Sequence, residues 1–165
     1  MRQKVLMCIM CTSVIILLFS CVFAASTNAS TPSLVTKISS AFTKIQGYLE
    51  YVIDNIKNEN VGICFDSGHY HVHFKDEFDF SKFKNKIFAV HLHDNDQSDD
   101  LHLMPFDGTL DWKKLVKDLK ENNYNGPITM ELCYRYEYLN MGIENFYKKG
   151  YEVGKKLKKM FEEKL

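Results

Sequence analysis

The chain has 165 residues, which is enough for one compact domain. Its 21 Lys and Arg residues balance 21 Asp and Glu residues, so the formal net charge at pH 7 is zero. The basic residues are spread along the sequence and form no dense stripe, so charge gives no reason to expect nucleic acid or another polyanion as a partner.

The first 25 residues differ in composition from the rest of the chain. Arg2 and Lys4 precede an apolar run over residues 5–25, which ends in small residues. A basic start, an apolar middle and a small-residue end are typical of a secretory signal peptide. Because the apolar run is long, a membrane anchor is the first alternative and a buried core helix the second. We therefore expect an exported protein, secreted or membrane-anchored, or a cytoplasmic one if this segment is a gene-fusion artefact.

The cysteines do not predict a disulfide-stapled fold. Three of the five lie within residues 1–25, and the other two, Cys64 and Cys133, lie in apolar runs. A thiol in such a run behaves as a small hydrophobic side chain. If a further strand separates the two runs, Cys64 and Cys133 are too far apart for a disulfide.

The rest of the chain alternates between helical and strand-like patterns. Residues 26–38 are polar and are expected to form a linker. Short continuous apolar runs separated by amphipathic stretches are typical of a parallel sheet covered by helices on both faces, so we expect an α/β fold. The expected elements are, in chain order, a helix over 40–57, a strand over 61–65, a short helical segment, a strand over 86–92, a helix over 111–122 capped by Asp111, a strand over 127–132 and a helix over 142–163.

Carboxylates and imidazoles accumulate where the three predicted strands end. The carboxyl ends of parallel strands meet at one edge of a sheet, which is where α/β barrels place their active sites. Oxygen and imidazole ligands suit a divalent cation such as manganese, magnesium, cobalt or zinc. The candidate residues are Asp66 and His69 after the first strand, His91 at the end of the second, Asp100 and His102 in the next loop, and Glu131 near the end of the third.

Several of these positions also have structural interpretations. Asp66 could cap a turn, and His71 and His73 fit surface positions. We expect His93 to neighbour the site without being a ligand. Glu131 is the most informative residue, because a buried strand seldom carries a carboxylate that has no partner.

Five segments follow the order and spacing of a known superfamily. The chain resembles the C-terminal portion of the xylose isomerase-like TIM barrel superfamily, which includes sugar phosphate isomerases and epimerases and the AP endonuclease family 2. The resemblance implies that residues 39–165 form the last three strands of a (β/α)8 barrel and their helices. The segments are Phe65-Asp-Ser-Gly-His69, Val90-His-Leu-His-Asp94, Asp100-Leu-His102, Gly108-Thr-Leu-Asp-Trp112 and Gly126-Pro-Ile-Thr-Met-Glu131.

In the single-metal sugar branch, the resemblance implies that Asp66, His91 and Glu131 are metal ligands and that His69 contacts a substrate oxygen. It also makes Glu131 one of two carboxylates that move a proton at a carbon next to a carbonyl. A divalent cation stabilises the enediolate that forms when this proton leaves, and carboxylates on opposite faces can remove and return it. The expected substrate is a sugar or a sugar phosphate.

Two other functions stay open. In the trinuclear endonuclease IV branch, the resemblance implies that His69, Asp100 and His102 also bind zinc, and the activity would be hydrolysis of abasic DNA. The absence of a basic stripe favours the sugar branch. The third hypothesis is a non-catalytic, exported binding domain.

A complete barrel has about 250 residues. The family's first metal-ligating Glu belongs to an earlier strand, and Glu50 is a poor match because it lies in the helix predicted over 40–57. We consider three explanations: a truncated, inactive product, an incomplete gene model of a full enzyme, or a chain that closes the barrel with a second copy or a complementary fragment. Membrane contact is expected only through the N-terminal segment.

Overall fold

A computed structural model describes residues 34–56, 59–75 and 77–164. The predicted leader over 1–25 and residues 26–33 of the predicted linker lie outside these ranges. In the part that is described, no helix is both long enough and apolar enough to cross a membrane. The first described helix, α2 (Leu34–Asn55), begins six residues before the predicted start.

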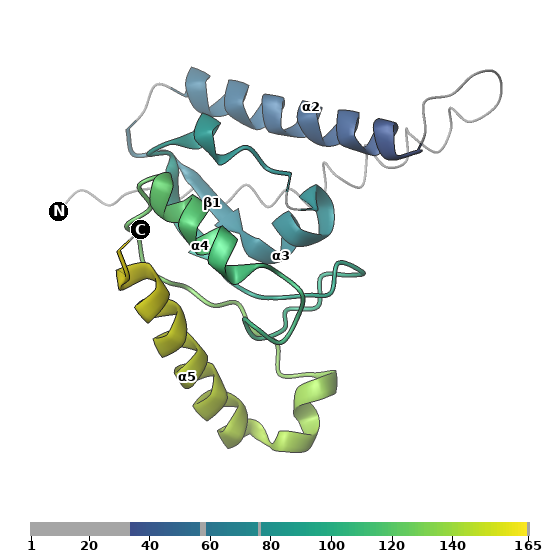
Figure 1. Cartoon of the computed structure of the whole chain (residues 1–165), viewed down its shortest axis with the longest axis vertical. Helices are drawn as coiled ribbons and strands as arrows, with labels where there is room; N and C mark the ends of the chain where they lie inside the picture. The colour runs from purple at the N-terminus through teal and green to yellow at the C-terminus, as the bar shows by residue number, and fades with distance from the viewer. Residues whose placement is uncertain (1–33, 57–58, 76, 165) are drawn as a thin grey trace.

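The core of the fold is a parallel pair of strands, β1 (Ile63–Asp66) and β2 (Ile87–His91), as predicted for the first two strands. Their register pairs Asp66 with His91 at the carboxyl ends. The crossover between the strands contains α3 (Ser67–His69), a π-helical turn over Tyr70–Phe74 and a 3-10 helix over Phe80–Phe83. In Figure 1, α2 and α5 (Ile143–Glu162) lie at opposite ends of the molecule, with the strands and α4 (Trp112–Glu121) between them.

The third predicted strand pairs with the sheet at only one position. Leu92 and Met130 form a parallel bridge, in which the Leu92 amide donates to Thr129 O at 2.8 Å and the Glu131 amide donates to Leu92 O at 3.2 Å. Beyond Leu92 the chain turns to pair Asp94 with Leu103, so no further ladder forms along the 127–132 segment. The ordered sheet among the described residues therefore has two strands, where three were predicted.

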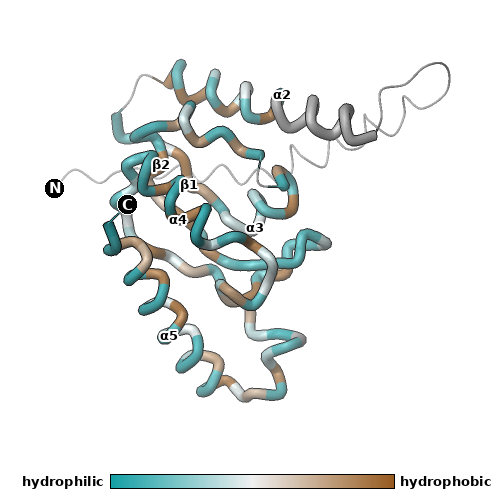
Figure 2. The backbone as a smooth tube through the Cα atoms, in the orientation of Figure 1, coloured by the Kyte–Doolittle hydropathy of each residue, from teal (hydrophilic) through white to brown (hydrophobic). Residues whose placement is uncertain are grey.

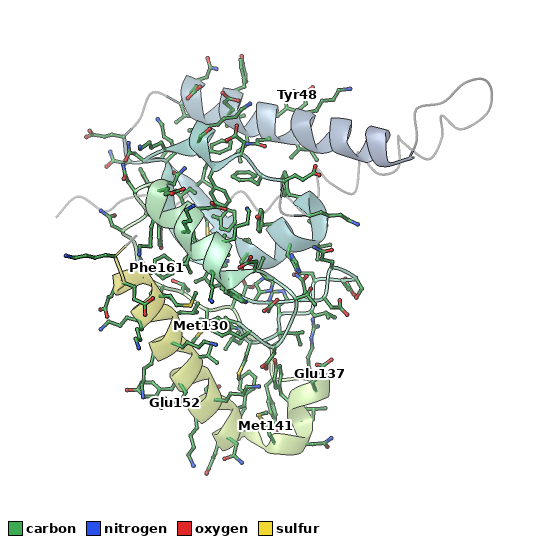
Figure 3. All side chains as sticks on the ribbon, viewed as in Figure 1. Tyr48, Met130, Glu137, Met141, Glu152 and Phe161 are labelled. Atoms are coloured by element: carbon green, nitrogen blue, oxygen red, sulfur yellow. The ribbon has the colours of Figure 1, made fainter. Side chains whose placement is uncertain are left out.

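Burial along this segment alternates. Ile128, Met130 and Leu132 are partly buried, whereas the intervening residues from Pro127 to Glu131 are exposed. Such alternation is typical of a strand that covers a core with one face only. The premise that Glu131 lies on a strand buried on both faces is therefore wrong. Figure 3 shows Met130 beside α5, and its Cε lies 3.2 Å from where a Cβ on Gly154 would be.

Both predicted C-terminal helices form close to their expected bounds. The Asp111 carboxylate accepts the Lys114 amide at 3.0 Å, which confirms Asp111 as the N-cap of α4. Hydrophobic and hydrophilic positions alternate along α4 and α5 (Figure 2), as expected for helices that cover a core with one side. A 3-10 helix over Tyr136–Met141 leads into α5, and Gly142 at φ 77° makes the turn between them.

The main hydrophobic core lies between the sheet and the helices. Its fully buried members include Phe83, Val90, Leu119 and Leu157, which come from the crossover, β2, α4 and α5. A smaller cluster of Leu103, Met104, Tyr138 and Phe146 joins the loop after β2 to the start of α5. Cys64 and Cys133 are both half-buried and are not joined by a disulfide.

Candidate metal centre

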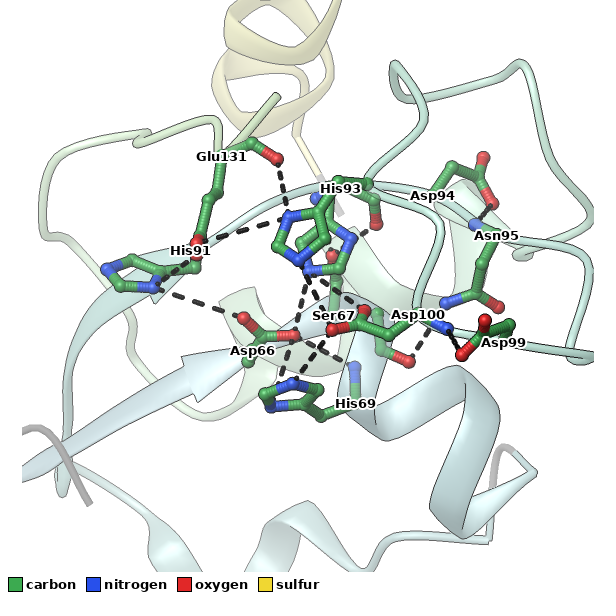
Figure 4. A network of polar contacts seen from close by, with 12 residues as sticks. Asp66, Ser67, His69, His91, His93, Asp94, Asn95, Asp99, Asp100 and Glu131 are labelled. Carbon is green, nitrogen blue, oxygen red and sulfur yellow. Dashed lines mark hydrogen bonds and ion pairs between the residues drawn. The ribbon is translucent and has the colours of Figure 1, made fainter. Parts of the chain in front are cut away.

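The ends of the paired segments bring together the three residues predicted to bind metal. Asp66 and His91 are neighbours in the strand register, and the bridge at Met130 places Glu131 beside them. His91 Nδ1 lies 2.9 Å from Glu131 Oε2 and 3.9 Å from Asp66 Oδ2 (Figure 4). One donor atom from each residue lies within 4.8 Å of the other two. Two carboxylates and an imidazole at this spacing fit the donor preferences of a divalent cation.

The other three predicted site residues form a second group, in which two histidines contact the carboxylate of Asp100. His69 Nε2 and His102 Nε2 each lie 3.2 Å from Asp100 Oδ2. His102 adopts a left-handed backbone conformation with φ 51°, and its Nδ1 lies 3.2 Å from Glu131 O. The structure therefore groups every predicted site residue, with His69, Asp100 and His102 beside the Asp66, His91 and Glu131 set.

Contacts with histidines lower the pKa of two half-buried carboxylates, Asp66 and Asp100. Burial alone raises the pKa of Asp100, but its hydrogen bond with His69 and the charges of His93, His69 and His102 outweigh burial and lower the pKa to about 2. Burial likewise raises the pKa of Asp66, and its hydrogen bond with His93 and the charges of His93 and His69 bring it below the usual value. The hydrogen bond with Asp100 raises the pKa of His69. Metal ligation requires carboxylates in this deprotonated form.

Two histidines lie in places that the sequence did not predict. His71 was expected at the surface, but its side chain is buried and its Nε2 lies 2.9 Å from Thr109 Oγ1. His73 is half-buried, and burial lowers its pKa. His93 was expected beside the site, and it is fully buried there with Nε2 3.1 Å from Asp66 Oδ1.

A second set of donors, from His93, His102 and Glu131, also meets within 4.8 Å. The rings of His93 and His102, however, are stacked, with centroids 4.1 Å apart and planes 8° from parallel. An imidazole binds a metal along a lone pair in its ring plane, so one ion cannot lie in both planes at once. Asp66, His91 and Glu131 therefore form the better-arranged of the two candidate cation sites.

Asp94 also belongs to the framework of the site. It is fully buried, and its Oδ1 accepts the backbone amides of Asn95 at 2.9 Å and Leu110 at 3.2 Å, while Oδ2 accepts that of Phe106 at 3.0 Å. These contacts close the loop that carries Asp100 and His102. The position of Asp94 after His93 was visible in the sequence, but its partners Phe106 and Leu110 lie 12 and 16 residues further on.

Parallel strands, covering helices and a carboxylate–imidazole cluster at the strand ends are the features of an α/β protein with a candidate cation site. The family described as xylose isomerase-like TIM barrel matches residues 46–159. The chain belongs to this family, which confirms the resemblance drawn from its sequence.

The curated relatives match about half or more of this chain but only about a third of their own length. Uncharacterized protein y4fM of Sinorhizobium fredii is 31% identical over 102 residues, which are 61% of this chain and 32% of the relative. The inosose isomerase of Halalkalibacterium halodurans is 26% identical over 100 residues, covering 56% of this chain and 35% of the relative. The chain thus spans about a third of the length of these curated relatives.

A solved structure gives the same fold. A crystal structure of IolI protein with a bound zinc atom matches 70% of this chain and 44% of its own chain, with a TM-score of 0.57 at 21% sequence identity. This likeness supports the TIM-barrel type of α/β fold.

Proposed function

We propose that the protein acts as a divalent-metal-dependent isomerase or epimerase of a sugar or sugar phosphate. The observation that carries the proposal is the convergence of Asp66, His91 and Glu131, whose donor atoms lie within 4.8 Å of one another. These are the residues that the family resemblance assigns to the metal. The relative named inosose isomerase supports a small sugar-like molecule as the substrate class.

In this proposal, Asp66, His91 and Glu131 hold the cation. When bound, a divalent cation supplies positive charge that stabilises the enediolate formed next to a carbonyl group. Glu131 is the proton-transferring group, since its exposed side chain can reach a substrate outside the core. His69, held by Asp100 at 3.2 Å, orients the substrate by donating a hydrogen bond to one of its oxygens.

The resemblance assigns the second proton-transferring carboxylate to an earlier barrel strand. Glu131 is the member of this pair that the matched motifs contain. Export through residues 1–25 is a further proposal, and the intact mass of the native polypeptide from its own cells, with its distribution between cells and medium, tests it.

The direct test follows a proton. The full chain, loaded in turn with Mn²⁺, Co²⁺, Mg²⁺ or Zn²⁺, is incubated with inosose or a ketose in D₂O, and NMR detects deuterium at the carbon next to the carbonyl. The proposal expects exchange that stops when a chelator is added. Metal binding without exchange would favour the non-catalytic binding domain, and absence of metal binding would overturn the proposed centre.

The endonuclease alternative rests on a different observation, the approach of His69 and His102 to the same oxygen of Asp100. That arrangement could hold a further zinc ion. It predicts chelator-sensitive cleavage of an oligonucleotide at an abasic site, abolished by His102→Ala. Cleavage with no sugar exchange would replace the isomerase proposal with this one.

A further inference from the structure

The backbone of His93 is clamped to the crossover that begins at Asp66. Ser67 Oγ donates to His93 O at 2.6 Å and accepts the His93 amide at 2.8 Å. Both residues are fully buried. The two hydrogen bonds fix the start of α3 against the segment that follows β2, and they set the direction in which the His93 side chain leaves the backbone.

Gly68 makes room for the His93 ring. A Cβ at Gly68 would lie 1.9 Å from His93 Cε1 and 2.6 Å from Nε2, so no larger residue fits while the ring keeps its place. The Asp66-Ser-Gly sequence is therefore shaped around this imidazole. Such a fitted cradle indicates that the ring's orientation matters to the site.

The ring is aimed at one oxygen of Asp66. His93 Nε2 lies 3.1 Å from Asp66 Oδ1, which also accepts the His69 amide at 2.9 Å. With Oδ1 held by these two donors, Oδ2 faces His91 Nδ1 at 3.9 Å. His93 thus turns the carboxylate so that its second oxygen points into the candidate cation site, as Figure 4 shows.

The two ring nitrogens of His93 have different surroundings. His93 Nδ1 is buried and has no hydrogen-bond partner among the described residues, whereas Nε2 lies 3.1 Å from Asp66 Oδ1. Nε2 is therefore the nitrogen through which His93 contacts the carboxylate. The ring of His102 stacks on the ring of His93, with centroids 4.1 Å apart.

We propose that His93 is a positioning residue of the metal centre: by donating from Nε2 to Asp66 Oδ1, it presents Asp66 Oδ2 to the cation. The inference rests on the proposed metal centre, in which Asp66 is a ligand. Hydrogen bonds that orient metal ligands are typically worth about 10–100-fold in metal affinity.

The experiment measures cation affinity and the cobalt spectrum of the full chain. Titration calorimetry with Mn²⁺ and Co²⁺ is expected to show a dissociation constant about 10–100-fold higher for His93→Leu than for the wild type. His93→Gln, whose amide nitrogen can reach Asp66, is expected to stay within a few-fold of the wild type. The absorption bands of bound Co²⁺ should shift in His93→Leu, because the orientation of a ligand has changed.

His71→Leu is the matched control, because His71 is also a buried histidine but lies on the π-helical turn over Tyr70–Phe74, where its ring nitrogens contact Thr109 and Gln97. It is expected to lower stability and leave cation affinity unchanged. If His93→Leu does not fold, the polar pair His93→Gln and His93→Asn carries the test. The shorter Asn cannot reach Asp66, so only His93→Asn should weaken binding.

The outcomes separate the two claims. If the wild type binds no divalent cation, the proposed metal centre fails and this role of His93 fails with it. If the wild type binds and folded His93→Leu or His93→Asn binds equally well, the positioning role alone is overturned. An equal loss in His71→Leu would also overturn it, because the effect would then come from general loosening of the fold.

Discussion

The indole nitrogen of Trp112 donates a hydrogen bond to the buried carboxylate of Asp94 at 2.7 Å. With the three backbone amides that Asp94 also accepts, this bond ties the end of β2 to the first residue of α4. Gly108 lies against the same carboxylate, where a Cβ would come within 2.3 Å of Oδ1. The Val90–Asp94 and Gly108–Trp112 segments therefore form one structural unit, which fixes both ends of the loop carrying Asp100 and His102.

Replacing Asp94 tests this unit. In Asp94→Asn, the amide nitrogen faces donors, so at least one buried N–H loses its acceptor. We expect the free energy of unfolding to fall by about 1–3 kcal/mol, measured by urea denaturation followed by circular dichroism. Asp54→Asn, at an exposed position on α2, is the control and should change stability by less than about 0.5 kcal/mol. Equal stability of Asp94→Asn and the wild type would contradict the role given to Asp94.

Glu131→Gln tests the proton-transfer role. The amide keeps the shape of the side chain but cannot accept the substrate proton, so we expect deuterium exchange to fall by at least about 100-fold. The protein should remain folded by circular dichroism. Glu137→Gln, at an exposed position of the 3-10 helix over Tyr136–Met141 (Figure 3), is the matched control and should exchange like the wild type. Unaltered exchange in folded Glu131→Gln would remove Glu131 from the mechanism.

Metal should stabilise the folded chain. A ligand that binds only the native state at about 100 times its Kd adds about 2.7 kcal/mol to the free energy of unfolding. We expect Mn²⁺ or Co²⁺ to raise the Tm and a chelator to reverse the change. His91→Asn should lose most of this response, whereas His73→Asn, outside the candidate ligand set, should keep it. A response that survives His91→Asn would locate the cation elsewhere.

The stability of the metal-free protein should depend on pH through Asp100. Its pKa is about 2 in the folded chain against 3.8 for an ordinary Asp, so the unfolded state binds more protons between these values. The stabilisation is therefore present above about pH 4 and is lost as pH falls through 2. It is on the order of 1 kcal/mol after allowance for solvent screening.

Urea unfolding at several pH values checks this prediction. The difference in unfolding free energy between the wild type and Asp100→Asn should be largest near pH 5 and should shrink as pH approaches 2. Asp79→Asn, at an exposed position in the crossover, provides the reference for general acid destabilisation. A difference that stays constant from pH 5 to 2 would show that Asp100 is not held ionised by its histidines.

Local sequence patterns predicted those helices and strands that are specified mainly by the residues within them. The apolar runs that became β1 and β2 and the Asp111 cap of α4 are cases of this kind. The 127–132 segment has the composition of a strand, but it can extend the sheet only where another segment runs beside it. The chain that continues from β2 turns away after Leu92, so the two segments form a single bridge. Sequence pattern alone does not contain that turn.

The same limit explains the histidines. His71 and His73 alternate with Tyr70, Val72 and Phe74, and this pattern does not tell which of the two histidines is buried. His71 is buried against Thr109, whose place depends on the path of the loop after β2. Asp94 sets that path through contacts with Phe106, Leu110 and Trp112. The convergence of Asp66, His91 and Glu131 was predictable because it follows from the ends of parallel segments.

The close fit between Gly68 and the His93 ring means that a substitution at one of these positions limits which residues the other can carry. Glycine is needed at position 68 because an imidazole occupies the space that a methyl group would fill. A chain with a smaller residue at position 93 has no such requirement and can carry alanine or serine at 68. In the evolution of this family, the two positions should therefore change together, and a bulky residue at 68 should mark members that orient the residue matching Asp66 by other means.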